Sequence, residues 1–484
     1  MSLKIGWAEV DITPQELPVC IAGQFHARVS EGVLDPIKAT ALVLDTGDDH
    51  VVFVTVDTVS ISEPLWQGVR DLLNEEGLDP QKVVLNATHT HEAPLNRLVS
   101  NGSYRPWQEA DSNLKLDARP SDEYVSFAAA RIASAVSQAW QKRAEGGVAY
   151  GLDYAVVGRN RRWFNTEGEA TMYRLNETTA DTFSHIEGYE DHSLNVMATY
   201  DTDGALTGLV VNVPSPSQED EGSFSISADF WHETRRELRE RFGEHLFILP
   251  QCSAAGDQTS HLIFEKAPHE RMLRLRNRTA RQEVAVRIAD AVGRILPYIT
   301  DEIDYAPQLQ HQYEVLQLPL NNLSEADVED ARKNQQELEE MLVQEKQKLF
   351  DDPSLQQQPR WYVTFTGAYS RAGWYQGVID RFERQKTDPN FPAEVHIIRL
   401  GDIAFATNPF EYYLDYGIRI KVQSPAIQTF LVQLAGNGTY IPSKRAADGG
   451  GYGAVPASNP VGAEGGEVLA RYTVAKIRDF WKEA

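Results

Sequence analysis

Cysteine is scarce in this sequence of 484 residues. There are two cysteines, Cys20 and Cys252, which lie far apart and outside any Cys-x-x-Cys motif. Such sparse cysteines favour a reducing compartment or buried thiols over a disulfide scaffold or a thiolate metal site. A metal ion in this protein would therefore be bound mainly by imidazole and carboxylate groups.

Positive charge is also in short supply. The sequence has 46 Lys and Arg residues against 70 Asp and Glu residues, a formal net charge of −24. Neutralising the phosphates of a nucleic acid requires a basic face, so no nucleic-acid partner is expected. A local cationic pocket is still compatible with this average.

Long apolar runs are absent as well. No run approaches the ~20 residues that a membrane-spanning helix requires, so no stable membrane insertion is expected. The opening segment MSLKIGWAEVDITP lacks the basic region and apolar core of a secretory signal. We expect a soluble protein, which is cytoplasmic unless the initial MSL stands in place of an export signal.

The composition is that of an ordinary globular protein, with 42% hydrophobic and 24% charged residues and no visible internal repeat or low-complexity linker. We therefore expect one domain over residues 1–484. A charged stretch at about 323–350, preceded by Ser324 as a helix cap, predicts a long surface helix inserted into that domain. The glycine-rich residues 446–460 lack the setting of a phosphate-binding loop and predict a flexible loop.

Two parts of the sequence share one order of elements: two apolar strand-like runs, a helix, and a further buried strand that ends in a polar cluster. This order is typical of α/β proteins, in which ligands gather at the carboxyl ends of strands. A third α/β-like block follows Glu394. The first part predicts strands at 39–44, 51–56 and 82–85 and a helix at 63–74; the second predicts strands at 194–200, 206–213 and 245–250 and a helix at 229–243.

The polar cluster after the first block is the segment NATHTHEAP. Residues i and i+2 of a strand point to the same face, so His89 and His91 project together from the strand end. The two imidazoles could bind one metal ion, or one could bind it while the other handles protons. The alternative is a pair of hydrogen-bonded turn histidines.

Carboxylates follow two other apolar runs. Asp57 ends VVFVTVD and is either a metal ligand, an acceptor that orients an imidazole, or a helix cap. Glu411 in NPFEYY follows the run IAFAT and is either part of a mixed His and carboxylate site or an ordinary glutamate at a helix start.

The turn GDQTSH follows the buried strand of the second block. It brings the carboxyl of Asp257, the hydroxyls of Thr259 and Ser260 and the imidazole of His261 to one place. Such a set is suited to nucleophilic catalysis, whereas its structural interpretation is a capped turn.

Seven motifs occur in one order between Gly6 and Tyr440: GWAEVDITP, IAGQFHAR, VVFVTVDTVSIS, ATHTHEAP, GDQTSH, NPFEYY and GTYIPS. The ordered set resembles the catalytic domain of the neutral/alkaline non-lysosomal ceramidases, and ATHTHEAP is its most specific member. The resemblance implies a large single α/β domain with mixed β-sheets flanked by helices. The immunoglobulin-like domain at the C-terminus of that family is not expected, because only about 45 residues follow Tyr440 and such a sandwich needs roughly 100.

The resemblance further implies a zinc-dependent amidase whose metal is held by two histidines, a glutamate and a tyrosine. Carried over by motif, His89 is the first zinc histidine, Glu411 the glutamate and Tyr440 the tyrosine. His91 matches the neighbouring histidine of the signature, and Thr259 stands where the family has its nucleophilic serine.

The sequence departs from the family pattern at the second zinc histidine. The segment VVNVPSPSQED (210–220), which matches that region, contains no histidine. His232, on the next predicted helix, is our first choice as its replacement, followed by His185 and His192. A zinc site with fewer protein ligands and the loss of metal are the open alternatives. The family's SGP after the histidines is EAP here, which introduces Glu92.

The segment VGRNRRWFN concentrates positive charge in an otherwise acidic chain. It contains Arg159, Arg161 and Arg162, with Trp163 beside them. Charge clusters are usually solvated, but arginine forks also match carboxylate and sulfate geometry. Arg159, Arg161 and Trp163 are therefore our candidates for binding an anionic group of a substrate.

The sequence is compatible with three functions. The leading one is a zinc-dependent hydrolase that cleaves an amide or related bond in a small, non-ceramide substrate, with zinc held by His89, His232, Glu411 and Tyr440. The second is a carbohydrate-active hydrolase or lyase acting on an anionic oligosaccharide. The third is a non-catalytic binding protein with a degraded site. A homo-oligomer is compatible with all three.

Overall fold

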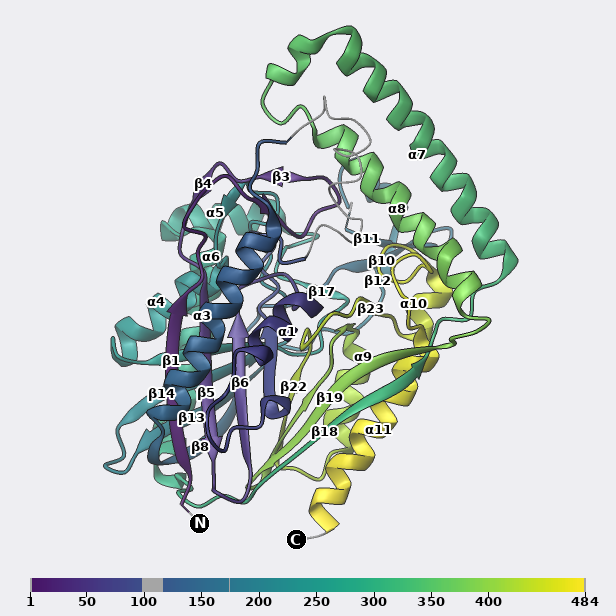
Figure 1. Ribbon diagram of the computed structural model, residues 1–484. Helices are drawn as coiled ribbons and strands as arrows, with labels where there is room; N and C mark the ends of the chain where they lie inside the picture. Colours follow the sequence, from purple (N-terminus) through teal and green to yellow (C-terminus); the bar gives the residue numbers. More distant parts are fainter. Residues whose placement is uncertain (1, 98–115, 174, 483–484) are drawn as a thin grey trace.

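The computed structural model describes residues 2–97, 116–173 and 175–482. Two β-sheets pack face to face, and helices cover the outer face of each sheet (Figure 1). The predicted class, an α/β fold with mixed sheets flanked by helices, is confirmed.

The larger sheet is mixed, with the strand order β16-β14-β13-β8-β1-β5-β6-β7. Its two outermost pairs, β14 with β16 and β6 with β7, are parallel, and the inner pairs are antiparallel. The strands are β1 (Lys4–Asp11), β5 (Lys38–Asp45), β6 (His50–Val56), β7 (Val83–Ala87), β8 (Ala144–Tyr154), β13 (Ser193–Asp201), β14 (Leu206–Val213) and β16 (Phe247–Cys252).

The smaller sheet has the order β18-β19-β20-β22, and its last pair is parallel. Its strands are β18 (Leu309–Pro319), β19 (Asn390–Leu400), β20 (Ile403–Thr407) and β22 (Gln428–Val432). Because β5, β6, β20 and β22 are buried on both faces, their sequences read as continuous apolar runs and do not alternate.

The core between the sheets is built from side chains that point inward from both. Phe53 of the larger sheet contacts Phe405 of the smaller one with ring centroids 4.9 Å apart, and Phe405 stacks on Phe430 at 4.6 Å. All three rings are fully buried. Burying each stabilises the fold by about 2–3 kcal/mol, so this layer fixes how the sheets face one another.

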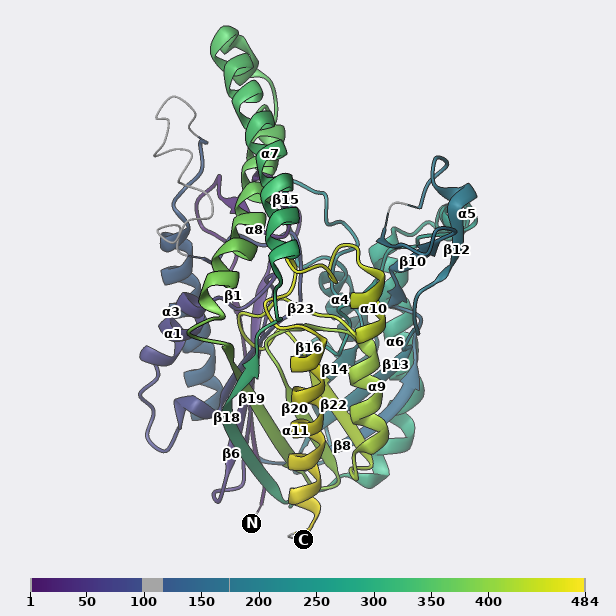
Figure 2. The ribbon, with the colours of Figure 1, turned by 90° about the vertical axis from the view of Figure 1, so that its right-hand side faces the viewer.

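Helices form the two outer layers. Against the larger sheet lie α1 and α3 over one half and α4 and α6 over the other, whereas α9 and α11 cover the smaller sheet (Figure 2). Local signals set where they begin: the Ser62 hydroxyl accepts from the backbone of α1, and Thr279 forms a capping box on α6. Their bounds are α1 (Glu63–Asp71), α3 (Ser121–Gln141), α4 (Phe230–Phe242), α6 (Ala280–Ile299), α9 (Leu414–Gln423) and α11 (Ala463–Lys482).

One unit occurs three times in this architecture: an antiparallel hairpin, a helix, and a strand that pairs in parallel with the second hairpin strand. The units are β5-β6-α1-β7, β13-β14-α4-β16 and β19-β20-α9-β22. A parallel return strand ends at the same sheet edge as its partner. The polar segments that follow these strands therefore gather at the edge where α/β folds bind ligands.

Two helices, α7 (Glu325–Asp351) and α8 (Val363–Arg384), pack as a hairpin that extends beyond the sheets (Figures 1 and 2). The capped helix anticipated at about 323–350 is α7, whose N-cap is Ser324. The glycine-rich residues 446–460 were predicted to form a flexible loop, but the first of them belong to helix α10 (Lys444–Gly449). Within the described parts of the chain, no helix combines the length and apolar character needed to cross a membrane.

A buried histidine pair joins β18 to β19 away from the sheet edge described above. His311 Nε2 lies 2.9 Å from His396 Nδ1, and His396 Nε2 lies 2.9 Å from a carboxylate oxygen of Glu394. Burial lowers the pKa of both histidines, that of His311 well below its usual value. The folded protein therefore holds this pair neutral near pH 7.

This pair predicts an acid-sensitive contribution to stability. In the unfolded chain histidine titrates near pH 6.5, so below that pH the unfolded state binds more protons and the free energy of unfolding falls, by up to about 1.4 kcal/mol per pH unit for each histidine. We expect His311→Gln to lose less stability than wild type between pH 7 and pH 5 in urea unfolding. The exposed His185→Gln should keep the wild-type slope, and identical slopes for all three proteins would refute the explanation.

Candidate active site

The three polar segments converge at one sheet edge and bring together residues that are far apart in the sequence. His89 and His91 follow β7, and Thr259 lies beyond β16 in the short strand β17 (Gln258–Thr259). Glu411 begins β21 (Glu411–Tyr412), and Tyr440 begins β23 (Tyr440–Ile441). These last two strands pair in parallel with Glu411 opposite Tyr440, so the backbone register itself sets the two side chains beside each other.

His89 is held in one orientation by its backbone and its ring. Its φ of 66° lies in the left-handed region, which non-glycine residues adopt rarely. Its Nδ1 lies 2.6 Å from the carbonyl oxygen of Val59. A carbonyl only accepts, so Nδ1 carries the proton and Nε2 presents a lone pair. That lone pair faces a carboxylate oxygen of Glu411 at 3.4 Å.

His91 presents a second imidazole to the same place. Its Nε2 lies 3.3 Å from Nε2 of His89, and its Nδ1 lies 3.3 Å from a carboxylate oxygen of Glu221. Burial, followed by the neighbouring His89, holds the pKa of His91 well below its usual value. His91 Nδ1 forms no hydrogen bond within the described structure, and the Nε2 atoms of the two imidazoles face each other.

Glu221 anchors His91 and was missed by the sequence analysis. It accepts a hydrogen bond of 2.8 Å from Gln218 and lies 3.5 Å from Nε2 of His261. Burial alone would raise its pKa, but the hydrogen bond to His261 and the charges of His91 and His261 lower it to about 2. The one available signal was its place directly after segment 210–220, where the family histidine is missing.

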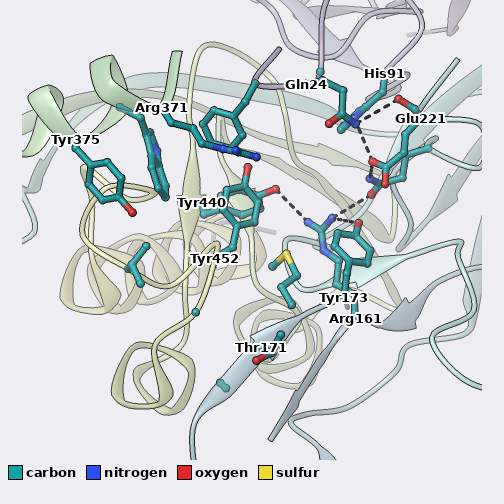
Figure 3. A pocket seen from close by; sticks show the side chains of 18 residues that line it. Gln24, His91, Arg161, Thr171, Tyr173, Glu221, Arg371, Tyr375, Tyr440 and Tyr452 are labelled. Carbon is teal, nitrogen blue, oxygen red and sulfur yellow. Dashed lines mark hydrogen bonds and ion pairs between the residues drawn. The ribbon is translucent and has the colours of Figure 1, made fainter. Parts of the chain in front are cut away.

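A buried guanidinium, that of Arg161, lies on the other side of Glu411. Its Nη1 donates to the Tyr173 hydroxyl at 2.6 Å, and its Nη2 donates to the Tyr440 hydroxyl at 3.2 Å (Figure 3). The same Nη2 lies 3.6 Å from the Glu411 oxygen that faces His89. Although burial opposes the charge, Tyr173, Tyr440 and Glu411 keep the pKa of Arg161 well above its usual value, so the site contains a permanent cation.

These groups line the inner end of a cavity of about 650 Å³. His91, Arg161, Tyr173, Glu221 and Tyr440 face it, and Figure 3 shows their side chains directed toward one another from different ribbons. A smaller hollow of about 220 Å³ reaches His89 and Glu411 and shares four lining residues with the larger cavity. The cavity has the volume range of a small-molecule site with convergent polar groups.

Comparison with known proteins identifies the architecture. No protein-family model and no curated protein matches the sequence. Among solved structures, neutral ceramidase from Pseudomonas aeruginosa matches with a TM-score of 0.68 and 14% identity, over 100% of this chain and 75% of that one. A ceramidase complexed with C2 matches with a TM-score of 0.65 and 13% identity, over 100% of this chain and 76% of that one.

The chain has the ceramidase-like fold. That part of the sequence-based prediction is confirmed, since both similar structures cover the whole chain. At this level of identity the likeness concerns the fold, and the roles of individual residues have to be argued from the geometry.

The GDQTSH turn of this ceramidase-like fold is buried. Asp257 accepts from the backbone of Leu414 at 3.0 Å and from the Asn160 side chain at 3.1 Å, which makes it a structural brace. The Thr259 hydroxyl accepts from the backbone of His261 at 3.2 Å, and the residue has no exposed surface. Ser260 Oγ is buried without a hydrogen-bond partner among the described residues. None of these three side chains faces the 650 Å³ cavity.

Only one of the predicted substrate-binding residues lies in the cavity. Arg161 lines it, whereas Arg159 faces Glu190 at 4.0 Å and lies outside it. Trp163 is buried behind the wall, where its ring nitrogen donates to the backbone oxygen of Tyr173 at 2.6 Å. Trp163 therefore supports the position of Tyr173 rather than contacting a ligand.

The histidines considered as replacements for the missing zinc ligand lie elsewhere. His232 is directed to Asp35 at 3.8 Å and lines a separate cavity at the side of α4. Asp229, the N-cap of α4, has a φ of 53°, so the chain enters this helix through a left-handed residue. The other two candidates, His185 on an exposed strand and His192 3.3 Å from Glu190, also lie outside the 650 Å³ cavity.

Asp57 is not part of the site either. Both of its oxygens bind the guanidinium of Arg235, at 2.7 and 3.0 Å, and it also accepts from the backbone of Lys38 at 2.8 Å. Asp57 therefore forms a buried ion pair that links α4 to the end of β6. This role is not among the three that the sequence suggested for Asp57.

The donor atoms near His89 fit a zinc ion in their chemistry. Zinc binds nitrogen and oxygen ligands at about 2.0–2.2 Å in a tetrahedron, which sets neighbouring ligand atoms roughly 3.3–3.5 Å apart. His89 Nε2 is 3.3 Å from His91 Nε2 and 3.4 Å from the Glu411 oxygen. The His89 imidazole is also fixed through Nδ1 by a carbonyl oxygen, as in metal-binding histidines.

The same donors do not form a closed metal cage. In the described ranges, no three or more His, Cys, Asp and Glu side chains lie together as a group that could hold a metal ion. Arg161 also competes for Glu411 and Tyr440. A metal ion beside His89 would therefore have few protein ligands, and its remaining coordination positions would face the cavity.

Glu92, the departure from the family pattern beside His91, has an unusual environment. Its carboxyl has no exposed surface, and burial together with the negative charge of Asp229 raises its pKa to about 8. An acid whose folded pKa is raised stabilises the protein below its unfolded pKa near 4.3, and this contribution is lost as pH rises toward 8.

Glu92→Gln tests this environment. The amide keeps the shape of the protonated acid and cannot ionise, so the variant should gain stability relative to wild type as pH rises from 5 to 8, by about 3 kcal/mol over that range. Urea unfolding at several pH values measures this gain. A constant difference between the two proteins over that range would show that Glu92 is ionised throughout.

Proposed function

We propose that the protein is a divergent member of the neutral/alkaline ceramidase family and a hydrolase that cleaves an amide or a related bond in a small, non-ceramide substrate. One observation carries the proposal. Two imidazole lone pairs and a carboxylate oxygen meet within 3.4 Å of His89 Nε2, next to a buried guanidinium and at the end of a cavity. Grouping several hydrogen-bond acceptors with no cation or proton between them costs free energy. Histidines with a purely structural role in a turn do not need such a group.

His89, His91 and Glu411 are the residues that would hold zinc, with Tyr440 adjacent, and His91 would take the place of the missing second histidine. A bound zinc ion would supply the Lewis acid that polarises a carbonyl or lowers the pKa of a water. The contact of His89 Nδ1 with the carbonyl oxygen of Val59 keeps the Nε2 lone pair of that ring directed inward before a metal binds.

Arg161 and Tyr440 are suited to stabilise negative charge on a substrate oxygen. The guanidinium is permanently charged, and burial together with Glu411 holds the pKa of the Tyr440 phenol well above its usual value, so the phenol stays protonated. Donors fixed before the reaction are worth most in a water-poor site, where removing one typically costs about a hundredfold or more in rate.

Glu221 lies 3.3 Å from His91 Nδ1 and restrains the ring whose Nε2 would bind zinc. Thr259, the sequence-based candidate for the nucleophile, is less suited to attack, because it has no exposed surface and does not line the cavity. We therefore assign the attacking group to water and leave Thr259 the role of supporting the His261 turn.

The structure bears differently on the two alternative functions, a non-catalytic binding protein and an enzyme acting on an anionic sugar. A non-catalytic protein with a degraded site would have no reason to keep His89, Glu411 and Tyr440 together, which argues against it. A hydrolase or lyase acting on an anionic sugar keeps specific support from the aromatic and cationic outer half of the cavity.

Hydrolysis is tested with a panel of N-acyl compounds and zinc-replete protein. His89→Ala and Glu411→Gln should each lower kcat/KM for an accepted substrate at least about a hundredfold, because each removes a group that acts on the transition state. Amine release measures turnover. Chelator treatment should abolish the activity and added zinc should restore it.

His185→Ala is the matched control, since this exposed histidine is a rejected zinc candidate and should leave turnover unchanged. Wild-type turnover by His89→Ala would refute the assignment of the site. Full activity after exhaustive chelation would refute the zinc dependence.

A further inference from the structure

The outer half of the 650 Å³ cavity is a continuous aromatic surface. The Tyr440 and Tyr452 ring centroids are 5.5 Å apart, and Tyr452 lies 6.0 Å from both Phe25 and Trp374. Trp374 continues to Tyr375 at 5.1 Å. The surface begins beside the inner polar groups and ends on helix α8, so it forms one wall of the cavity that Arg161 also lines.

One cation, Arg371, stands over this surface. It projects from α8 into the cavity, and its guanidinium carbon lies 5.3 Å from the ring centroid of Phe25 (Figure 3). Within the part of the chain that the structure describes, no carboxylate pairs with it, whereas Arg384 on the same helix pairs with Asp388 at 2.7 Å. Arg371 is exposed and lines the cavity without an acidic partner in the described residues, so its planar fork is available to an anion in a protein whose net charge is −24.

The lining also indicates the kind of molecule. Aliphatic side chains are few here, with Met172 and Val455 the largest, so the cavity offers little to a long acyl chain. Flat rings and phenol hydroxyls suit a ligand that is itself a ring with polar substituents. A planar anion on that ring would meet the fork of Arg371, which is less strongly hydrated than a lysine ammonium.

We propose that the outer half of the cavity binds a carbohydrate ring that carries a carboxylate or sulfate group, with the anion on Arg371 and the ring against Trp374 and Tyr452. This inference deepens the proposed function and rests on it for the cavity being a substrate site. The bond to be cleaved then lies on the inner side of this ring, toward Arg161.

The test is a binding titration followed by saturation-transfer NMR, which does not depend on turnover. The probes are glucuronate and galacturonate, their neutral counterparts glucose and galactose, and the 6-sulfates of the two neutral sugars. Wild type should bind the anionic probes at least about tenfold more tightly than the neutral ones. Arg371→Gln should remove this preference, and Trp374→Ala should weaken binding of all probes.

Arg384→Gln is the matched control, because it removes a guanidinium from the same helix outside the cavity and should retain the wild-type preference. Equal binding of neutral and anionic sugars, no binding of any probe, or an unchanged preference in Arg371→Gln would each overturn the inference. Comparing the affinities of the uronates and the sugar 6-sulfates shows whether the site prefers a carboxylate or a sulfate. Binding without any hydrolysis would refute the proposed function alone, and hydrolysis of neutral amides without an anion preference would refute this inference alone.

Discussion

The buried guanidinium of Arg161 is the interaction on which the rest of the site depends. A charge without solvent is tolerated only where acceptors surround it, and losing one partner of such a set typically costs about 3–5 kcal/mol. Its acceptors come from distant segments: Tyr173, Gln218, the carbonyl of Gly256, Glu411 and Tyr440. The cation therefore fastens these segments together and sets the electrostatic potential at the inner end of the cavity.

The repeated hairpin–helix–strand unit of the fold brings those acceptors together. Each of the three hairpin–helix–strand units ends a parallel pair at the same edge, so three polar segments arrive there independently. The core between the sheets, centred on Phe53 and Phe405, fixes the third unit against the first two. The proposed catalytic groups are thus positioned by the two sheets, while α8 adds the outer wall of the cavity.

Much of the fold and part of the site could be predicted from the sequence. Runs such as VVFVTV read as strands because both of their faces are buried. The ordered motifs led to His89, His91, Glu411 and Tyr440, and the arginine cluster VGRNRRWFN led to Arg161. Glu221 and Arg371 could not be found in this way. Their roles arise from contacts across long stretches of chain, to His91 and to the Phe25 ring, which no local spacing encodes. For His232 the helix was predicted, but its side chain lies beside Asp35 at a separate cavity, which the sequence position alone does not indicate.

The central claim is that the lone pairs of His89 and His91 and the carboxylate of Glu411 are directed at one cation position. An anomalous difference map tests it most directly, from crystals of protein purified without chelator and supplied with zinc, recorded on both sides of the zinc absorption edge. The account predicts a zinc peak in contact with His89, His91 and Glu411 that is lost in His89→Ala. A map with no peak at these residues, or with zinc bound only elsewhere, would contradict it.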